Sequence, residues 1–187
     1  MLMPRSHSTP TIRVLTCYGL EPLVRAVGVD YEVLLRQAGI EPLLMNNPES
    51  RIPFHRYVKL LENAAIATGD DLIGLHMGSM QSIKLLGVLG YLLQSSPDVR
   101  TQLTHTARYF ALQQDAASLT LRTAGPALEF VYSVYDPNVA LHRQDAEGTL
   151  ALAVANWRTL TGQAHWSPLS VHFEHPAPAK EIELTRY

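Results

Sequence analysis

Apolar residues in the first half of the chain recur at the spacing of an α-helix. The clearest case is the segment 51–69, where residues three and four apart share one face and a terminal glycine supplies a stop signal. Two shorter segments, 20–27 and 31–38, each end before a glycine, and Asp30 can cap the second. We therefore predict three helices, with the proline- and asparagine-rich segment 41–50 as a connection.

Residues 85–94 form a strongly apolar segment that is interrupted by Gly87 and Gly90. We predict a helix in which both glycines lie on one side and let another element pack closely, with a cavity wall as the alternative. Ser96 followed by a proline is a helix-start signal, so a second helix is predicted from there to Phe110.

The hydrophobic period then changes from helical to the alternation of a strand. Segments 118–124 and 127–134 alternate, and Gly125 followed by proline between them predicts a β-hairpin. A long helix is predicted over 142–161, and 167–175 alternates again as a strand. The predicted buried stripe of the long helix consists of Leu150, Val154, Trp157 and Thr161.

This order of elements predicts an α+β fold in which N-terminal helices pack on a small antiparallel sheet made by the hairpin and the last strand. That strand would leave an open sheet edge, so we expect the fold to be incomplete at the C-terminus. Residues 1–10 are predicted to be a flexible tail, and residues 11–187 a single domain.

Charge and cysteine content restrict the classes of function. The formal net charge is -2, and the basic residues are scattered, so this chain by itself is not expected to bind nucleic acid strongly. The single cysteine, Cys17, allows no internal disulfide, and the N-terminus lacks the apolar region of a signal peptide. Because the apolar run at 85–93 is too short to span a bilayer, we predict a cytoplasmic protein without membrane contact.

Sequence motifs of catalysis and cofactor binding are absent. There is no P-loop, no dinucleotide-binding glycine pattern, no G-x-S-x-G elbow and no H-E-x-x-H pair. His172 and His175 would lie on opposite faces of a strand, which disfavours a shared metal ion. We predict no enzyme activity, no cofactor and no metal site.

Several polar residues are nevertheless placed where a pocket could use them. Arg143 and Glu147 are four apart on the long helix, and they form either a surface ion pair or part of a polar cluster that faces a cavity. The tyrosines of the central region have an apolar body and a polar tip, which suits a pocket or a core margin. The candidate effector-binding residues are Tyr91, Gln94, His105, Tyr109, Tyr132, Arg143, Gln144 and Glu147.

Three segments, in order and spacing, carry a resemblance to a known family. They are "RIPFHRYVKLLENAAIATGDD", "LGVLGYLLQSSPDVR" and "VHFEHPAP". The chain resembles, over about residues 20–187, the N-terminal arabinose-binding-like regulatory domain of AraC/XylS-type transcription regulators.

The resemblance implies an effector-sensing and dimerising domain of a bacterial regulator. It implies a homodimer, a small-molecule effector, DNA binding through a C-terminal helix-turn-helix domain that this sequence does not include, and contact of the full-length protein with RNA polymerase. Two alternatives stay open: a dimerisation module without a ligand, and a small α+β enzyme that would use His105 or His172.

Overall fold

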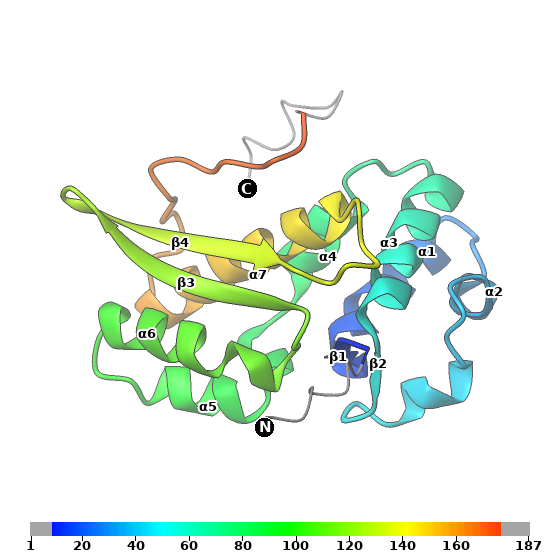
Figure 1. Cartoon of the computed structure of the whole chain (residues 1–187), viewed down its shortest axis with the longest axis horizontal. Coiled ribbons are helices and arrows are strands. Elements are labelled where there is room, and N and C mark those ends of the chain that lie inside the picture. Colours follow the sequence, from blue (N-terminus) through cyan, green and yellow to red (C-terminus); the bar gives the residue numbers. More distant parts are fainter. Residues whose placement is uncertain (1–8, 177–187) are drawn as a thin grey trace, which may run out of the picture.

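The first half of the chain consists of helices tied together by one short pair of strands (Figure 1). The computed structural model describes residues 9–176. The strands β1 (Thr11–Arg13) and β2 (Arg51–Pro53) pair antiparallel. The helices of this half are α1 (Leu20–Ala26), α2 (Tyr31–Gln37), α3 (Phe54–Thr68) and α4 (Ile73–Met80), with short 3-10 helices at Val14–Gly19 and Pro42–Asn46.

Local sequence signals determine where these helices begin and end. The Asp30 carboxylate accepts hydrogen bonds from the backbone N–H groups of Glu32 and Val33, as predicted for an N-cap. Helix α3 ends at Gly69, whose φ of 68° suits glycine better than any other residue. Its predicted start was three residues too early, because Arg51–Pro53 pair with β1 as a strand.

The second half contains a helical pair, a hairpin and one long helix. The elements are a 3-10 helix at Ile83–Leu86, α5 (Val88–Gln94), α6 (Val99–Tyr109), a 3-10 turn at Phe110–Leu112, β3 (Ala117–Ala124), β4 (Ala127–Val134) and α7 (Arg143–Thr161). The predicted hairpin is confirmed, with Leu119 opposite Tyr132 and Leu121 opposite Phe130. These four side chains share one face, and the Phe130 ring lies 4.9 Å from that of Trp157 on α7.

The main hydrophobic core lies in the first half. It joins β1, β2 and α1 to α4, and its fully buried side chains include Phe54, Leu60 and Leu61 from α3. A smaller apolar cluster of Ile83, Leu89 and Leu93 lies under the α5–α6 pair. The hairpin side chains Leu121 and Phe130 are only half-buried, so the hairpin is held less by burial than α3 is.

Helices α4 and α7 make the most extensive helix–helix contact among the described residues. Gly74 and Gly78 of α4 face Gln144 and Gly148 of α7 so closely that a Cβ atom at either α4 position would collide with the α7 backbone. A Cβ atom at Gly148 would lie 2.8 Å from the carbonyl oxygen of Gly74. Backbone therefore packs directly on backbone, which only glycine permits.

This contact explains why the predicted buried stripe of α7 is wrong. Leu150, Val154, Trp157 and Thr161 are only half-buried. The buried face instead carries Gln144, Gly148 and Ala151 and lies against α4. A hydrophobic-periodicity argument misses this face because glycine and glutamine carry no apolar signal.

Two details of the predicted 85–110 helices are also wrong. Gly87 has φ 56° and ψ −129°, which ends the 3-10 turn before α5, so 85–94 is not one continuous helix. A Cβ atom at Gly87 would lie 3.2 Å from Nη1 of Arg13, which adds a steric reason for glycine there. The N-cap of α6 is Asp98, whose carboxylate accepts from the Thr101 N–H at 2.7 Å, whereas the Ser96 hydroxyl donates to the Leu92 carbonyl.

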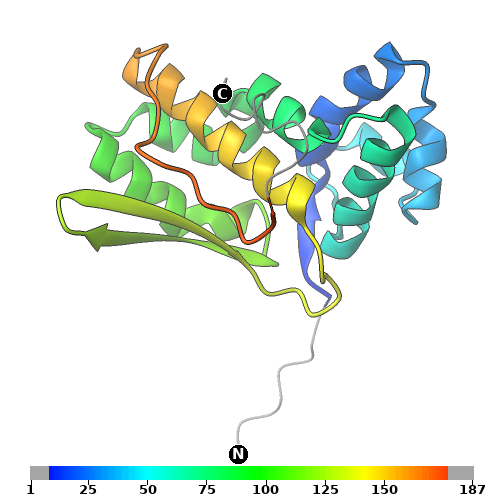
Figure 2. The same cartoon turned by 90° about the horizontal axis from the view of Figure 1, so that it is seen from above.

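The predicted third strand at 167–175 is not formed in the part of the chain that the structure describes. After α7 the chain turns back and runs beside this helix towards its N-terminal end (Figure 2). The Trp166 ring contacts Trp157 at 5.6 Å, and His175 Nε2 lies 3.6 Å from the Glu147 carboxylate. Side-chain contacts with α7 replace the strand pairing that the alternation suggested.

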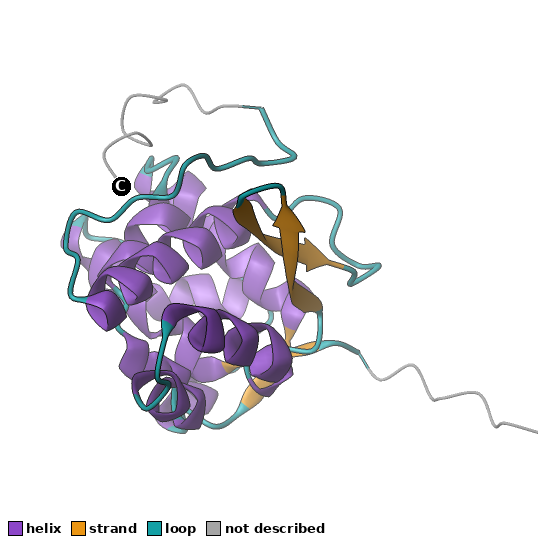
Figure 3. Ribbon diagram, turned by 90° about the vertical axis from the view of Figure 1, so that its left-hand side faces the viewer, coloured by secondary structure: helices purple, strands orange, loops and turns teal. Residues whose placement is uncertain are grey.

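The α+β class is confirmed. Helices fill most of the molecule, and the β3–β4 hairpin lies at one side (Figure 3). Residues 1–8 of the predicted tail lie outside the described residues. Between residues 9 and 176, no helix has the length and apolar content needed to cross a membrane.

Candidate functional site

The first turns of α7 bury polar side chains that a solvent-facing helix would expose. Gln144, Asp145 and Glu147 are all almost completely inaccessible to solvent. Burying polar side chains is energetically unfavourable unless they form hydrogen bonds or ion pairs. The partners of these three residues therefore show how the site is stabilised.

Arg143 forms hydrogen bonds with two acidic residues, Asp71 and Glu147. Its Nη1 and Nη2 atoms donate to Oδ1 and Oδ2 of Asp71 at 3.0 and 3.1 Å, and Nη2 also donates to the Asp71 carbonyl oxygen at 2.8 Å. Its Nε donates to Oε1 of Glu147 at 2.8 Å, which confirms the predicted i,i+4 pair. The Glu147 side chain is 0% exposed and that of Arg143 is 24% exposed, so this is not a surface ion pair.

Gln144 ties the start of α7 to the start of α4. Its Oε1 accepts from the Gly74 N–H and its Nε2 donates to the Asp71 carbonyl, both at 2.9 Å. The close approach of Gly74 makes both bonds possible, since a side chain there would push the helices apart. Helix α7 therefore begins at a fixed position relative to Asp71.

Four buried atoms around Arg143 have no hydrogen-bond partner within residues 9–176. They are Oε1 of Glu62, Oε2 of Glu147, Nδ1 of His142 and Nε2 of His175. Burial raises the pKa of Glu62 and of Glu147, although the charge of Arg143 acts in the opposite sense for both. Burial also lowers the pKa of His142. We call Glu62, Asp71, His142, Arg143, Glu147 and His175 the α7 polar cluster.

A second buried polar group lies between α7 and the hairpin. The Tyr132 hydroxyl donates to Oδ2 of Asp145 at 2.7 Å and accepts from Nε2 of Gln114 at 3.0 Å. The oxygen of the Gln114 side-chain amide, Oε1, is also buried and has no hydrogen-bond partner within residues 9–176. Burial raises the pKa of Asp145 to about 7, although the bond from Tyr132 acts against the shift.

The predicted site residues fall into separate places. Arg143, Gln144 and Glu147 lie together at the start of α7, and Tyr132 lies in the second group. The other four residues belong to α5 and α6: Tyr91, Gln94, His105 and Tyr109. In the described chain, none of them forms a hydrogen bond with the α7 polar cluster or with the Tyr132–Asp145 group. The structure therefore does not bring the eight residues into one site.

The α5 and α6 residues have surroundings of their own. Tyr91 is 77% exposed. Nδ1 of His105 lies 3.1 Å from the Ser96 hydroxyl, and its ring is 6.0 Å from that of Tyr109. His172 likewise contacts the Ser170 hydroxyl. Neither histidine is hydrogen-bonded to a carboxylate in the described chain, which is the contact that the enzyme alternative required.

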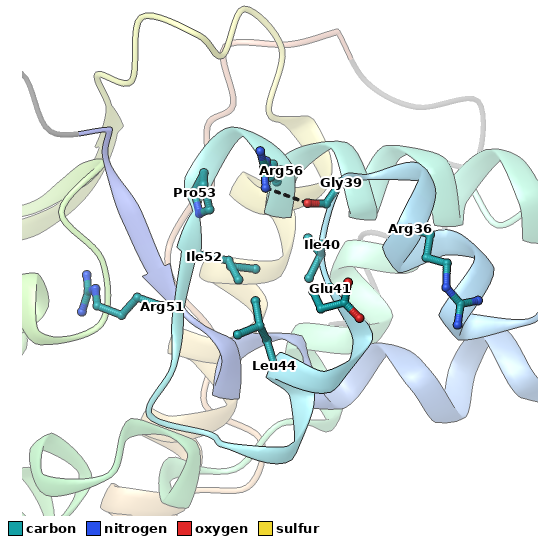
Figure 4. Close-up of a pocket in the computed structure, with 9 residues that line it drawn as sticks. All are labelled: Arg36, Gly39, Ile40, Glu41, Leu44, Arg51, Ile52, Pro53 and Arg56. Carbon is teal, nitrogen blue, oxygen red and sulfur yellow. Dashed lines mark hydrogen bonds between the residues drawn. The ribbon is translucent and has the colours of Figure 1, made fainter.

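A groove of about 460 Å³ lies elsewhere, between α2, β2 and the start of α3 (Figure 4). Its floor is apolar, with Ile40, Leu44 and Ile52, and Figure 4 shows the guanidinium groups of Arg36 and Arg51 turned away from that floor. Arg36 pairs with Glu32, Arg51 bonds Thr11, and Arg56 donates to the Gly39 carbonyl oxygen. With its arginines already bonded, the Glu41 carboxylate is the charged group of the lining that is left for a ligand.

Sequence reasoning missed Glu62, Asp71 and His175, which reach α7 from α3, from the α3–α4 loop and from the returning segment. No periodic signal marks them, because each is far from α7 in sequence. No group of three or more His, Cys, Asp or Glu residues between residues 9 and 176 is arranged to hold a metal ion.

Comparison with known proteins gives a consistent result. Residues 28–187 match the family model described as the arabinose-binding domain of AraC transcription regulator, N-terminal. The chain is 25% identical over 179 residues to the ornithine utilization regulator of Pseudomonas aeruginosa, covering 96% of this chain and 52% of that protein. It is 26% identical over 153 residues to the HTH-type transcriptional regulator VirS of Mycobacterium tuberculosis, covering 81% of this chain and 45% of that protein. The chain thus spans about half the length of the curated relatives it matches.

Proposed function

Because this chain belongs to the family of arabinose-binding N-terminal domains of AraC transcription regulators, we propose that it senses a small-molecule effector and controls an attached DNA-binding domain. The relatives carry the names of transcription regulators, which supports a regulatory role and not an enzymatic one. The family name and the name of the ornithine utilization regulator do not identify the effector of this chain.

We place the effector at the α7 polar cluster. The observation that carries this proposal is the set of buried, unpartnered polar atoms on Glu62, Glu147, His142 and His175. Buried polar atoms without partners are rare in folded proteins, and each calls for an explanation such as a functional role or a bound water or ion. A ligand that supplied the missing hydrogen bonds would connect α3, α7 and the segment at His175.

Such a connection provides a mechanism for signalling. An effector that binds one arrangement of these elements more tightly than another shifts the population towards it, in proportion to the difference in affinity. We propose that the shifted arrangement changes how a helix-turn-helix domain in the same protein meets its promoter. Contact with RNA polymerase and a cytoplasmic location remain predictions.

We also propose that the domain forms a homodimer. Val88 and Tyr91, one turn apart on α5, are 78% and 77% exposed, which is unusual for two large apolar side chains that neighbour each other. Light scattering over a concentration series would test self-association, and a monomer at all concentrations would contradict this part of the proposal.

The sensing role can be tested by a thermal-shift screen of small acids, amino acids, amines and sugars against this chain. The decisive variant is Arg143→Lys, which keeps the charge but loses the forked bonds to Asp71. We expect it to reduce the ligand-induced shift, whereas Arg122→Ala on the exposed outer face of β3 should not. Absence of stabilisation by any compound would contradict an effector-binding role.

A further inference from the structure

Negative charge exceeds positive charge in the α7 polar cluster. Three carboxylates, from Glu62, Asp71 and Glu147, surround one guanidinium group, that of Arg143. An isolated buried carboxylate is unfavourable, and Arg143 together with the His175 ring, 3.6 Å from the Glu147 carboxylate, still supplies fewer positive groups than the three carboxylates need. The charge balance alone does not define a site, but it sets the sign of a complementary ligand.

The unpartnered oxygens show where such a ligand would bind. Oε2 of Glu147 belongs to a side chain that is 0% exposed, and it has no hydrogen-bond partner within residues 9–176. Glu62 is half-buried and its carboxyl group accepts a backbone hydrogen bond from Gln144, but its buried atom Oε1 has no partner in the same part of the chain. The Arg143 guanidinium does not satisfy these two atoms, because its hydrogen bonds go to Asp71 and to the other oxygen of Glu147. Carboxylate oxygens only accept hydrogen bonds, so what is missing is a donor.

From these two observations, and on the basis of the proposed effector site, we propose that the effector is a cation with several N–H donors, an organic ammonium or guanidinium compound. Its charged group would lie between Glu62 and Glu147 and donate to their unpartnered oxygens. Charge-assisted hydrogen bonds of this kind are stronger than neutral ones. Burial raises the pKa of both carboxyl groups, and a cation bound beside them would act against that shift.

The same geometry disfavours anionic effectors. A carboxylate or phosphate ligand would need the Arg143 guanidinium as its hydrogen-bond donor. That guanidinium already forms a bidentate contact with Asp71 and a hydrogen bond with Glu147. Binding an anion would therefore displace Asp71, which forms no other ion pair in the described chain, or Glu147, whose other basic neighbour there is His175 Nε2 at 3.6 Å. A neutral sugar could donate to the free oxygens but would leave the excess charge unbalanced.

A matched ligand series tests the charge. Calorimetry at mildly alkaline pH would compare putrescine and agmatine with butanediol and succinate, which have four-carbon backbones but neutral or negative ends. We expect the two amines to bind and to raise the melting temperature, and the other two compounds to do neither. Binding should also release protons, measurable as a dependence of the heat on the buffer, because a cation lowers the pKa of both carboxyl groups.

Carboxamide variants test the position. Glu62→Gln and Glu147→Gln should each weaken amine binding roughly tenfold or more, since each removes one charge of a buried pair. Glu129→Gln, on an exposed position of β4, is the matched control and should bind as the unmodified chain does. Glu62→Gln provides the test if the fully buried Glu147 proves necessary for folding.

The outcomes separate this inference from the proposed function. If butanediol, succinate or another non-cationic compound binds and the amines do not, the cationic class is wrong while the sensing role stands. If the amines bind equally well to both carboxamide variants, the proposed position is wrong. If no compound of any charge binds, the proposed function and this inference are both overturned.

Discussion

Replacing Gly78 by alanine would place a methyl group where the backbone of α7 already lies. A Cβ atom at Gly78 would be 2.8 Å from the carbonyl carbon and 2.9 Å from Cα of Gly148, and closer still to the carbonyl oxygen. Non-bonded carbon atoms prefer about 3.5–4.0 Å. The two helices would have to separate by roughly 1 Å, because the obstacle is backbone and cannot rotate away as a side chain would.

The size of the effect follows from two opposing contributions. Alanine favours a helix over glycine by about 1 kcal/mol, which acts in favour of the variant. Overpacking a rigid contact costs about 1–3 kcal/mol and sometimes more. Separation would also stretch the bonds from Gln144 to Gly74 and Asp71, and each such bond contributes about 1 kcal/mol. We expect a net loss of about 2 kcal/mol in the free energy of unfolding.

Urea denaturation followed by far-UV circular dichroism would measure this loss, with a fall of about 4–8 °C in melting temperature as a second reading. Gly74→Ala should be about as harmful as Gly78→Ala. Gly148→Ala should be less harmful, since the nearest atom to its Cβ lies 2.8 Å away. Met80→Ala is the control in the same helix, because Met80 is largely exposed.

A Gly78→Ala variant as stable as the unmodified chain, or more stable, would refute the reasoning. Helix propensity would then be the larger contribution, and backbone contact between α4 and α7 could not exist in solution. A loss of equal size in Met80→Ala would also refute it, because the effect would then not depend on the contact.

Three further predictions concern other residues and the whole chain. Folding raises the pKa of Asp145 from 3.8 to about 7, so the folded state favours the protonated carboxyl group. The free energy of unfolding should therefore fall as the pH rises from about 4 to about 7. Urea titrations at several pH values should show a smaller fall for Asp145→Asn than for the unmodified chain. Burial raises the pKa of Cys17 to about 12, so its thiol should react with a thiol reagent only after unfolding, and rapid reaction of the native chain would show that Cys17 is accessible. Residues 1–187 have a net charge of -2 and should not shift promoter DNA in a gel. A longer protein that includes a helix-turn-helix domain should shift it. A specific shift by residues 1–187 alone would show that these residues contain the DNA-binding surface.

Features set by neighbouring residues were predictable from the sequence. Asp30 caps α2, Gly69 and Gly162 end α3 and α7, and the alternation on either side of Gly125 fixes the hairpin register. Each depends on backbone dihedral angles or hydrogen bonds within a few residues, so the chain carries the full signal locally. The i,i+4 pair of Arg143 and Glu147 is predictable for the same reason.

Features that depend on distant partners were not predictable. The buried face of α7 depends on Gly74 and Gly78 of α4, and the segment 167–175 follows α7 because Trp157 and Glu147 provide contacts there. The candidate site shows the same division. The sequence placed Arg143, Gln144 and Glu147 on one helix, but it could not show that Glu62, Asp71 and His175 surround them.

The sequence by itself thus determined the α+β class, most element boundaries and the family, because these rest on local patterns of residues. Only the tertiary structure decided which face of α7 is buried, and that two carboxylate oxygens near Arg143 have no hydrogen-bond partner among the described residues. The physical reason is that burial and charge balance depend on all neighbours in space, and some of those neighbours, such as Glu62 and Arg143, are about eighty residues apart in the chain.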